Sequence, residues 1–398
     1  MRIELSEPVI VSMGPDATTA GWGPYQFPYL YKGPDGQLLY TFNAGLDSVT
    51  AYGQEPHCCV SNDGGKSWQK EPYSEVQHLL GLQLPNGERL RFENLPSLPA
   101  EDMELPEPLC TSVKGFAAYA IKDLPDGVCK KTWEFTRFDA QHPDGVREQA
   151  KLNWPHLFTS GAKGVLIQPH PAARMRLAPD GSLWMPHYAS VGIDPKTGSV
   201  DSLQMSNYLL RSADNGRTWD MMAYLPYQPA SEKEATWEGY NENDIAFAPD
   251  GSMIRLIRTH VIYAKQAFEP MMITRSTDGG RTWSEPVEFD YTGVWPALLT
   301  LKCGVTLATY GRPGLFLRAT QDPSCMKWED HIELIHSDRT PNTPGSVVNM
   351  ATCSYTDLIP LDDCTAGLAY SDFTIKDENG VPRKTMIFRT IRCIPDEV

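Results

Sequence analysis

An eight-residue pattern, S-x-D-x-G-x-[ST]-W, occurs three times in this chain and constrains its fold more than any other feature. The copies occupy 61–68, 212–219 and 276–283. In each copy the Asp can accept hydrogen bonds from backbone N–H groups that follow it, and the Gly permits a positive φ angle, so the pattern predicts a tight turn between two strands. The Trp then begins the outgoing strand and packs over the turn. Three copies predict a repeated β-unit.

The spacing of these turns predicts the size of the repeat. The second and third copies start 276 − 212 = 64 residues apart, and the first two start 212 − 61 = 151 residues apart, roughly two more periods. A fourth, degenerate copy begins at Thr320 and ends at Trp328. A period of this length that is filled with short strands is typical of propeller blades of about four strands each. We expect the turns to stabilise the blades and to lie away from any active site.

A second repeat predicts the number of blades. An apolar strand, the triplet Pro-Asp-Gly and another apolar strand follow one another at 34–36, 179–181 and 249–251. This order indicates a hairpin between the first two strands of a blade. Variants of the triplet occur at 85–87, 302–304 and 362–364. Six blade openings result, near residues 26, 79, 171, 242, 296 and 353.

The predicted fold is all-β: a six-bladed β-propeller of four-stranded antiparallel blades that occupies residues 1–398 as a single domain. The segment 3–11 is expected to be an outer strand that completes the last blade, because closing the ring with both chain ends removes exposed sheet edges. The region 100–160 has no clear period, and we interpret it as a long insertion within blade two. Loops of this kind often shape a substrate site.

Composition and charge limit the possible partners. A formal net charge of −15 disfavours a nucleic-acid partner. The nine cysteines are an odd number without CxxC spacing, so we expect neither a disulfide framework nor a structural metal, and no cofactor. The N-terminus has no apolar signal segment and no stretch reaches membrane-spanning length, which predicts no membrane partner. The expected location is cytoplasmic, or secreted if a signal was removed, and the oligomeric state stays open.

The repeated turn is the Asp box, and residues at the blade openings resemble those of sialidases. Asn241–Gly251 followed by Arg258 is similar to the sialidase stretch in which a Glu, here Glu242, opens one strand and an Arg ends the next. Arg312 matches the place of another sialidase arginine. The segment 354–358 resembles the one that carries the family's nucleophilic tyrosine, here Tyr355. Asp47 lies 61 − 47 = 14 residues before the first Asp box, near the family's acid/base aspartate.

The resemblance implies an exo-acting, retaining glycoside hydrolase that cleaves a terminal, acidic sugar from a glycan or oligosaccharide. A phenol with a pKa near 10 is a weak nucleophile, so Tyr355 would need the Glu242 carboxylate to take its proton. A neutral tyrosine avoids repulsion from an anionic substrate, and sialidases are the glycosidases that use one. Asp47 would protonate the leaving oxygen. Arg258 and Arg312 would bind a substrate carboxylate.

Two positions depart from the sialidase pattern. Sialidases open blade one with Arg-Ile-Pro, whereas this chain has 26–28 as Gln-Phe-Pro, so Gln26 replaces an arginine that binds the carboxylate. Ser371 stands where the family has the glutamate that braces that arginine. Losing both partners together avoids a buried, unpaired carboxylate, which would cost several kcal/mol. Gln26 is expected to line a substrate site that has changed from that of sialidases.

Histidines leave a second interpretation open. His170 and His187 are expected to face the substrate, and His260 follows Arg258 closely. Propeller-fold polysaccharide lyases and some propeller rhamnosidases use His, Tyr and Arg, and lyase chemistry needs a base that works near neutral pH. The alternatives are therefore a lyase or rhamnosidase-type enzyme that acts on uronate-containing oligosaccharides, or a carbohydrate-binding propeller without catalysis.

Overall fold

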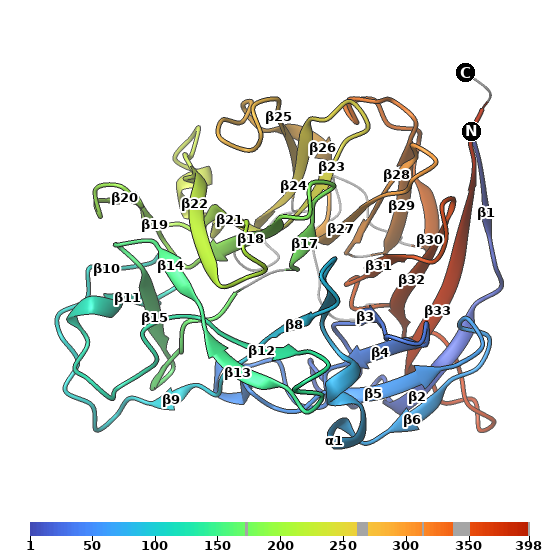
Figure 1. Cartoon of the computed structure of the whole chain (residues 1–398), viewed down its shortest axis with the longest axis horizontal. Helices are drawn as coiled ribbons and strands as arrows, with labels where there is room; N and C mark the ends of the chain where they lie inside the picture. The colour runs from blue at the N-terminus through green and yellow to red at the C-terminus, as the bar shows by residue number, and fades with distance from the viewer. Residues whose placement is uncertain (172–173, 261–269, 313, 337–350, 397–398) are drawn as a thin grey trace.

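Antiparallel sheets arranged in a ring form most of the described part of the chain (Figure 1). The computed structural model describes residues 1–171, 174–260, 270–312, 314–336 and 351–396, without the side chain of His260. Six of the sheets among these residues form the blades of a propeller. The chain visits them in sequence order, from blue through green and yellow to red in Figure 1. The all-β, six-bladed propeller predicted from the repeats is confirmed.

Blades one, four and five are four-stranded and use consecutive strands. Blade one contains β3 (Tyr29–Lys32), β4 (Leu38–Phe42), β5 (His57–Ser61) and β6 (Gln69–Glu71). Blade four contains β23 (Gly239–Phe247), β24 (Met253–His260), β25 (Met271–Ser276) and β26 (Val287–Asp290). Blade five contains β27 (Val294–Thr300), β28 (Thr306–Gly311), β29 (Leu315–Thr320) and β30 (Ile332–Ile335). The predicted hairpins join the first two strands in all three.

The other three blades recruit strands from elsewhere in the sequence or contain insertions. Blade two contains β7 (Leu82–Gln83), β8 (Arg89–Phe92), β12 (Glu134–Phe138) and β13 (Val146–Gln149). Blade three contains β17 (Arg176–Leu177), β18 (Leu183–Ala189), β21 (Ser206–Ser212) and β22 (Thr218–Leu225), with β14 (Lys151–Asn153) parallel to β22. Blade six contains β31 (Asp357–Pro360), β32 (Thr365–Asp372), β33 (Arg383–Ile394), β1 (Arg2–Leu5) and β2 (Val9–Asp16).

The N-terminal strand closes the ring. β1 pairs antiparallel with β33, and Arg2 lies opposite Ile394. Figure 1 shows the blue β1 beside the red β33, and the Met1 ammonium donates a hydrogen bond to Asp396 Oδ2. This pairing covers the outer edge of the longest strand in the last blade, which removes an edge that could otherwise pair with another chain. The expected closure of the propeller by its N-terminal strand is confirmed.

Residues inserted around blade two form a separate sheet. Its strands are β9 (Leu98–Pro99), β10 (Cys110–Thr111), β11 (Ala117–Ala120), β15 (Phe158–Ala162) and β16 (Val165–Leu166). The region 100–160 thus contains two strands of blade two as well as part of this added sheet. A further hairpin, β19 (Gly192–Ile193) and β20 (Val200–Ser202), projects from blade three.

Helices are few and short in the described chain. They are η1 (Val49–Ala51), α1 (Tyr73–Val76), η2 (Gln77–Leu79), η3 (Ile121–Asp123) and η4 (Glu234–Thr236). None of the described helices is long and apolar enough to cross a membrane.

Each Asp box connects the third and fourth strands of a blade. In the box of blade three, Gly216 N donates to Ser212 Oγ and Thr218 N donates to Asp214 Oδ1, both at 2.8 Å. The Trp219 indole donates to Gly216 O at 3.0 Å and its side chain is fully buried. The boxes of blades one and four repeat these contacts.

The degenerate fourth box keeps the same turn in blade five. Asp322 Oδ2 accepts a hydrogen bond from Lys327 N at 3.0 Å, and the Trp328 indole donates to Cys325 O at 2.7 Å. Cys325 takes the glycine's place with φ 54°, a left-handed conformation that costs a non-glycine residue energy. The hydrogen bonds of the box therefore persist without its glycine.

Strand direction separates the Asp boxes from the blade openings. Because neighbouring strands are antiparallel, the first and third strands of a blade end on the same face of the ring. The hairpins and Asp boxes follow those ends, so they share one face. The blade openings lie on the opposite face, and it is there that residues from different blades meet.

Candidate active site

A tyrosine and a glutamate from different blades form the centre of the site. Tyr355 precedes β31 at the opening of blade six, and Glu242 lies near the start of β23 in blade four. The Tyr355 hydroxyl donates a hydrogen bond to Glu242 Oε1, although 113 residues separate the two in sequence. Tyr355 is partly exposed, whereas Glu242 is buried. The phenol therefore reaches the open side of the pair, and the carboxylate lies behind it.

Two groups hold the other oxygen of Glu242. Arg258 Nη1 lies 3.0 Å from Glu242 Oε2, and Trp295 N donates to the same oxygen at 2.8 Å. Burial raises the pKa of Glu242, but Arg258, the Tyr355 hydroxyl, Arg312 and the Trp295 N–H together lower it below its ordinary value. Glu242 is therefore an anion that is ready to accept a proton.

The same surroundings keep Tyr355 protonated. Burial and the neighbouring charge of Glu242 raise the pKa of the Tyr355 phenol well above 10, although Arg258 and Arg312 act in the opposite direction. The phenol is neutral at rest, and its proton already points at the carboxylate that could receive it. This arrangement suits a nucleophile that loses its proton only as it attacks.

The backbone around this pair is irregular. The register of β23 shifts between Tyr240 and Asn243, which forms a bulge that contains Glu242. The register of β27 shifts in a similar way around Trp295. Bulges often aim side chains at active sites. Eight described non-glycine residues have positive φ, and five of them lie in or next to the site. These five are Tyr25, Phe27, Trp295, Arg312 and Ser354. Strain of this kind is stored where the surrounding structure enforces it, commonly at functional sites.

Aromatic rings enclose Tyr355. The Trp295 ring stacks on it with centroids 5.2 Å apart and 25° between the planes. The Phe27 ring meets it edge-on at 4.6 Å. The Arg312 guanidinium lies over the Tyr355 ring at 5.5 Å and donates through Nη2 to Cys353 O at 3.2 Å. The structure thus brings Arg312 to the ring of Tyr355, whereas Arg258 is 3% exposed and pairs with Glu242.

Asp47 lies at the rim, in the loop between β4 and β5. Its Oδ2 accepts a hydrogen bond from the Trp22 indole at 3.1 Å. Although the side chain is exposed, the surrounding protein raises the pKa of the Asp47 carboxyl above its ordinary value, and the charge of Glu242 adds to this. The Trp22 hydrogen bond and Arg312 lower it. Asp47 therefore shares its electrostatic environment with the central pair.

The two positions that depart from the sialidase pattern are buried and stabilise loops. Gln26 is fully buried and its Oε1 accepts a hydrogen bond from Gly23 N at 2.8 Å. Among the described residues its Nε2 has no partner. Ser371, on β32, accepts a hydrogen bond from Cys353 N at 3.0 Å. Ser371 thus supports the segment that leads to Tyr355, and the ring of Phe27 rather than the amide of Gln26 contacts Tyr355.

His187 and His170 pack against aromatic rings. His187 is buried among aromatic rings, 5.4 Å from Trp133 and 6.1 Å from Trp154. Burial lowers the pKa of His187 to about 3, with contributions from His170 and Arg255. His170 is half-buried, with its ring 5.5 Å from that of Tyr52 in the Asp47 loop. The side chain of His260 lies outside the described part of the chain.

Sequence reasoning missed several aromatic residues of the site. Trp22 contacts Asp47, and Phe27 and Trp295 contact Tyr355. Tyr188 is a further neighbour, since burial and then the charge of Glu242 raise its pKa well above 10. The sequence marks two of these residues by their position, since Phe27 and Trp295 each immediately precede a proline at a blade opening. No repeat marks Trp22, which lies in the loop before blade one.

Two surface cavities lie away from Tyr355 and Glu242. One, of about 390 Å³, is lined by Phe135, Glu148, Gln149, Ala150, Gly216 and Arg217. The other, of about 400 Å³, is lined by Glu288, Phe289, Asp290, Tyr291, Arg318, Asp330 and His331. Neither of these two cavities is lined by a residue of the candidate site.

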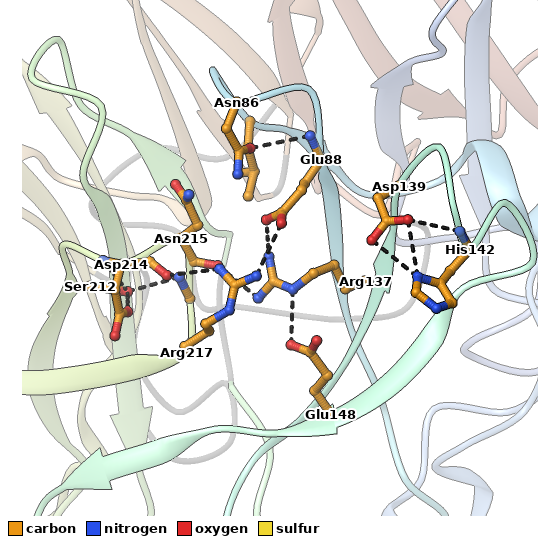
Figure 2. Close-up of polar contacts among 12 residues, drawn as sticks. Asn86, Glu88, Arg137, Asp139, His142, Glu148, Ser212, Asp214, Asn215 and Arg217 are labelled. Atoms are coloured by element: carbon orange, nitrogen blue, oxygen red, sulfur yellow. Dashed lines mark hydrogen bonds and ion pairs between the residues drawn. The ribbon is translucent and has the colours of Figure 1, made fainter.

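An ion network between blades two and three borders the first of these cavities. Figure 2 shows Arg137 between Glu88 and Glu148, with Arg217 also pointing at Glu88. Arg137 lies 2.6 Å from a carboxylate oxygen of Glu88 and 2.9 Å from one of Glu148, and Arg217 lies 3.0 Å from the other Glu88 oxygen. Arg137 also donates to Asn215 O within the Asp box at 2.9 Å. Since each charge in this network has a partner, we interpret it as a structural link between the two blades.

Comparisons with known proteins identify the fold. No protein-family model matches the sequence, and a search of curated proteins found no match. A protein of unknown function from Dyadobacter fermentans has a similar crystal structure, with a TM-score of 0.61 and 17% identity over 98% of this chain and 99% of that one. At this identity the likeness concerns the fold alone.

Enzymes occur among the more distant structural neighbours. A Hadza microbial sialidase matches with a TM-score of 0.49 and 16% identity, over 92% of this chain and 65% of that one. An α-L-arabinofuranosidase from Fusarium graminearum, solved with an iminosugar inhibitor, matches with a TM-score of 0.49 and 13% identity over 97% of both chains. The fold of this chain is a six-bladed β-propeller.

Proposed function

We propose that this protein is a retaining glycoside hydrolase that removes a terminal, acidic sugar from a glycan or oligosaccharide, with Tyr355 as the nucleophile. The hydrogen bond from the Tyr355 hydroxyl to the buried Glu242 carboxylate carries the proposal. A phenol needs such a partner to act as a nucleophile, and Glu242 is held ionised to serve as one.

The first step forms a bond between the Tyr355 oxygen and the anomeric carbon of the sugar. The phenol proton passes to Glu242 along the existing hydrogen bond. Asp47 gives its proton to the glycosidic oxygen, so that the leaving group departs as a neutral alcohol. The raised pKa of Asp47 favours the protonated form that this step requires.

The second step hydrolyses the glycosyl–Tyr355 intermediate. The Asp47 carboxylate takes a proton from water as the water oxygen attacks the anomeric carbon. The bond to Tyr355 breaks, and Glu242 returns the proton to the phenolate. Two displacements on one carbon retain its configuration.

The charge around the phenol supports an acidic substrate. The Arg312 guanidinium lies over the Tyr355 ring at 5.5 Å, whereas Arg258 is 3% exposed and already bound to Glu242, so Arg312 is the cation positioned to meet a substrate carboxylate. Guanidinium groups bind carboxylates through charge-assisted hydrogen bonds. A lyase that used His187 as its base is disfavoured, because that imidazole is buried among aromatic rings.

Hydrolysis of a substrate panel tests this function. The wild type would be assayed on aryl glycosides of neutral sugars, uronic acids and sialic acid, and NMR would record the anomer released first. We expect a retained product from at least one glycoside. Tyr355→Phe should lower kcat by about a thousandfold or more, because it removes the nucleophile.

Tyr240→Phe is the matched control, since Tyr240 lies on the same strand as Glu242 and its ring packs 5.0 Å from that of Tyr227. Its kcat should equal that of the wild type. Full activity of Tyr355→Phe would reject the nucleophile. An unsaturated, ultraviolet-absorbing product from uronate oligosaccharides would indicate a lyase, and binding without turnover would indicate a carbohydrate-binding propeller.

A further inference from the structure

One tryptophan contacts two charged residues of the site. The Trp22 indole N–H donates to Asp47 Oδ2 at 3.1 Å, and Asp47 N donates back to Trp22 O at 3.2 Å. The guanidinium of Arg312 lies over the Trp22 ring, 5.0 Å from its centroid. The ring also meets Phe27 edge-on at 6.3 Å. Trp22 therefore contacts both Asp47 and Arg312, the residue whose guanidinium lies over the Tyr355 ring.

A buried lysine holds the loop that presents this tryptophan. Lys384 lies on β33, is 3% exposed, and donates through Nζ to Gly21 O at 2.6 Å and to Pro24 O at 3.3 Å. Its ammonium also lies 5.4 Å from the Phe373 ring centroid. These two carbonyls flank Trp22 in sequence, so Lys384 fixes the loop on both sides of it. A buried ammonium is costly unless it is paired in this way.

The loop has further ties to blade one. Asn43 Nδ2 donates to Gly23 O at 3.4 Å and to Gly45 O at 2.8 Å, which joins the Trp22 loop to the loop that carries Asp47. Gly23 has φ 123°, and a Cβ there would lie 2.2 Å from Asp47 N. A side chain at this position would push the two loops apart. The close approach of the Trp22 and Asp47 loops is thus built into the backbone.

We propose that Trp22 is a positioning residue for the glycosidase reaction, which orients the acid/base Asp47 and seats Arg312, and that Lys384 holds it in place. The inference rests on the proposed function only for the roles of Asp47 and Arg312. The contacts of Trp22 can be measured without any turnover.

The expected consequence is a change in the acidity of Asp47. A hydrogen bond to a carboxylate favours its charged form, so the Trp22 indole lowers the pKa of Asp47 against the surrounding protein, which raises it. The other groups that act on Asp47 are Glu242, which raises its pKa, and Arg312 and Lys114, which lower it. Replacing the indole by a ring without an N–H removes one of these contributions and leaves the charges in place.

Trp22→Phe is the main test, because phenylalanine keeps a ring beneath Arg312 and removes the hydrogen bond. The first step needs protonated Asp47, so kcat/KM falls as pH rises through the pKa of Asp47 in the free enzyme. In Trp22→Phe this fall of kcat/KM, the basic limb of the pH profile, should move to higher pH by about half a unit to one unit. A pKa change of this size corresponds to the free energy of one hydrogen bond. Lys384→Met should move the limb in the same direction, because the loop is released.

Trp68→Phe is the matched control. Trp68 lies in the Asp box of blade one, where its indole donates to Gly65 O at 3.2 Å on the opposite face. This variant loses an indole hydrogen bond of similar length, and its pH profile should match that of the wild type. An equal shift in Trp68→Phe and Trp22→Phe would reduce the role of Trp22 to general stability and overturn the proposal.

Carboxyl NMR provides a readout that does not depend on activity. With ¹³C-labelled aspartate, and Asp47→Asn to assign the signal, the Asp47 titration should move to higher pH in Trp22→Phe. An unchanged Asp47 titration would overturn the inference even if hydrolysis occurs. If the titration moves but the wild type hydrolyses no glycoside, the contact is established and the proposed function fails instead.

Discussion

The two faces of this propeller use carboxylates in different ways. In the Asp boxes a carboxylate bonds to groups within a few residues of itself. Asp214 accepts hydrogen bonds from Ser212 Oγ, a residue shown beside it in Figure 2, and from Thr218 N. On the opposite face Glu242 is bound by residues of blades four, five and six: Arg258, Trp295 and Tyr355. The boxes recur around the ring, whereas the Glu242 constellation occurs once in the described chain.

We infer from this difference that the Asp boxes stabilise the fold, whereas the Glu242–Tyr355 pair serves the proposed reaction. Hydrogen bonds lower the pKa of the aspartate in the Asp boxes, as Asp63 and Asp278 show. Each of these carboxylates accepts hydrogen bonds from the backbone of its own turn. At the site, opposing influences act on one pair: the pKa of Glu242 falls while that of Tyr355 rises. Pairs of groups with pKa values driven apart mark a proton donor and its acceptor.

Among the variants that test this comparison of the two faces, Glu242→Gln should have the largest effect. The amide keeps the size of the side chain but accepts a proton poorly, so we expect kcat to fall by about 10²–10⁴-fold. Glycosidase assays on the accepted substrate would measure this. Glu134→Gln is the matched control, a buried acid of blade two that lies 2.8 Å from Lys130. If both variants lost activity equally, the loss would not be specific to the candidate site, and the distinction between the two faces would be wrong.

A smaller effect, on stability, is predicted for Asp214→Ala. The variant loses hydrogen bonds from Ser212 Oγ and Thr218 N, each 2.8 Å long, so the free energy of unfolding should fall by about 1–2 kcal/mol. Urea titration would measure the loss. Because the box lies on the face opposite the site, kcat/KM should equal that of the wild type. Unchanged stability with reduced activity would contradict the assignment of the boxes to the scaffold.

The smallest effect is a pH dependence in the degenerate box. Hydrogen bonds from Ser324 and the following backbone lower the pKa of Asp322 from 3.8 to about 2. Since the folded pKa lies below the unfolded one, this stabilisation is present above pH 3.8 and is lost as pH falls through about 2. The stability gap between the wild type and Asp322→Asn should therefore shrink over that interval. A gap independent of pH would show that the charge of Asp322 contributes nothing.

Much of the fold could be predicted because its signals are local. The turns at 34–36 and 249–251 and the Asp boxes form their hydrogen bonds within a few residues, so short patterns identify them. Blade two was harder, because its third strand, Glu134–Phe138, follows a long insertion that breaks the period. The added sheet pairs strands from two separate insertions, and no local pattern encodes that pairing.

The site was predictable only where a motif marked it. Tyr355, Glu242, Arg258 and Arg312 resemble sialidase positions, and the structure brings them together. The pairing of Arg258 with Glu242 lies at the bulge of β23, and the contact of Trp22 with Asp47 depends on the tight backbone approach at Gly23, whose φ is 123°. Sequence patterns do not reveal such strained conformations, because the surrounding fold imposes them.

Trapping of the covalent intermediate tests the central claim most directly. An activated fluorosugar matched to the accepted substrate would be incubated with the protein, because the fluorine slows the second step more than the first when the leaving group is good. Peptide mass spectrometry would then locate the label. We predict a single glycosyl adduct on the Tyr355 oxygen, absent in Tyr355→Phe. An adduct on Glu242 or Asp47, or an inverted product without an adduct, would contradict the account.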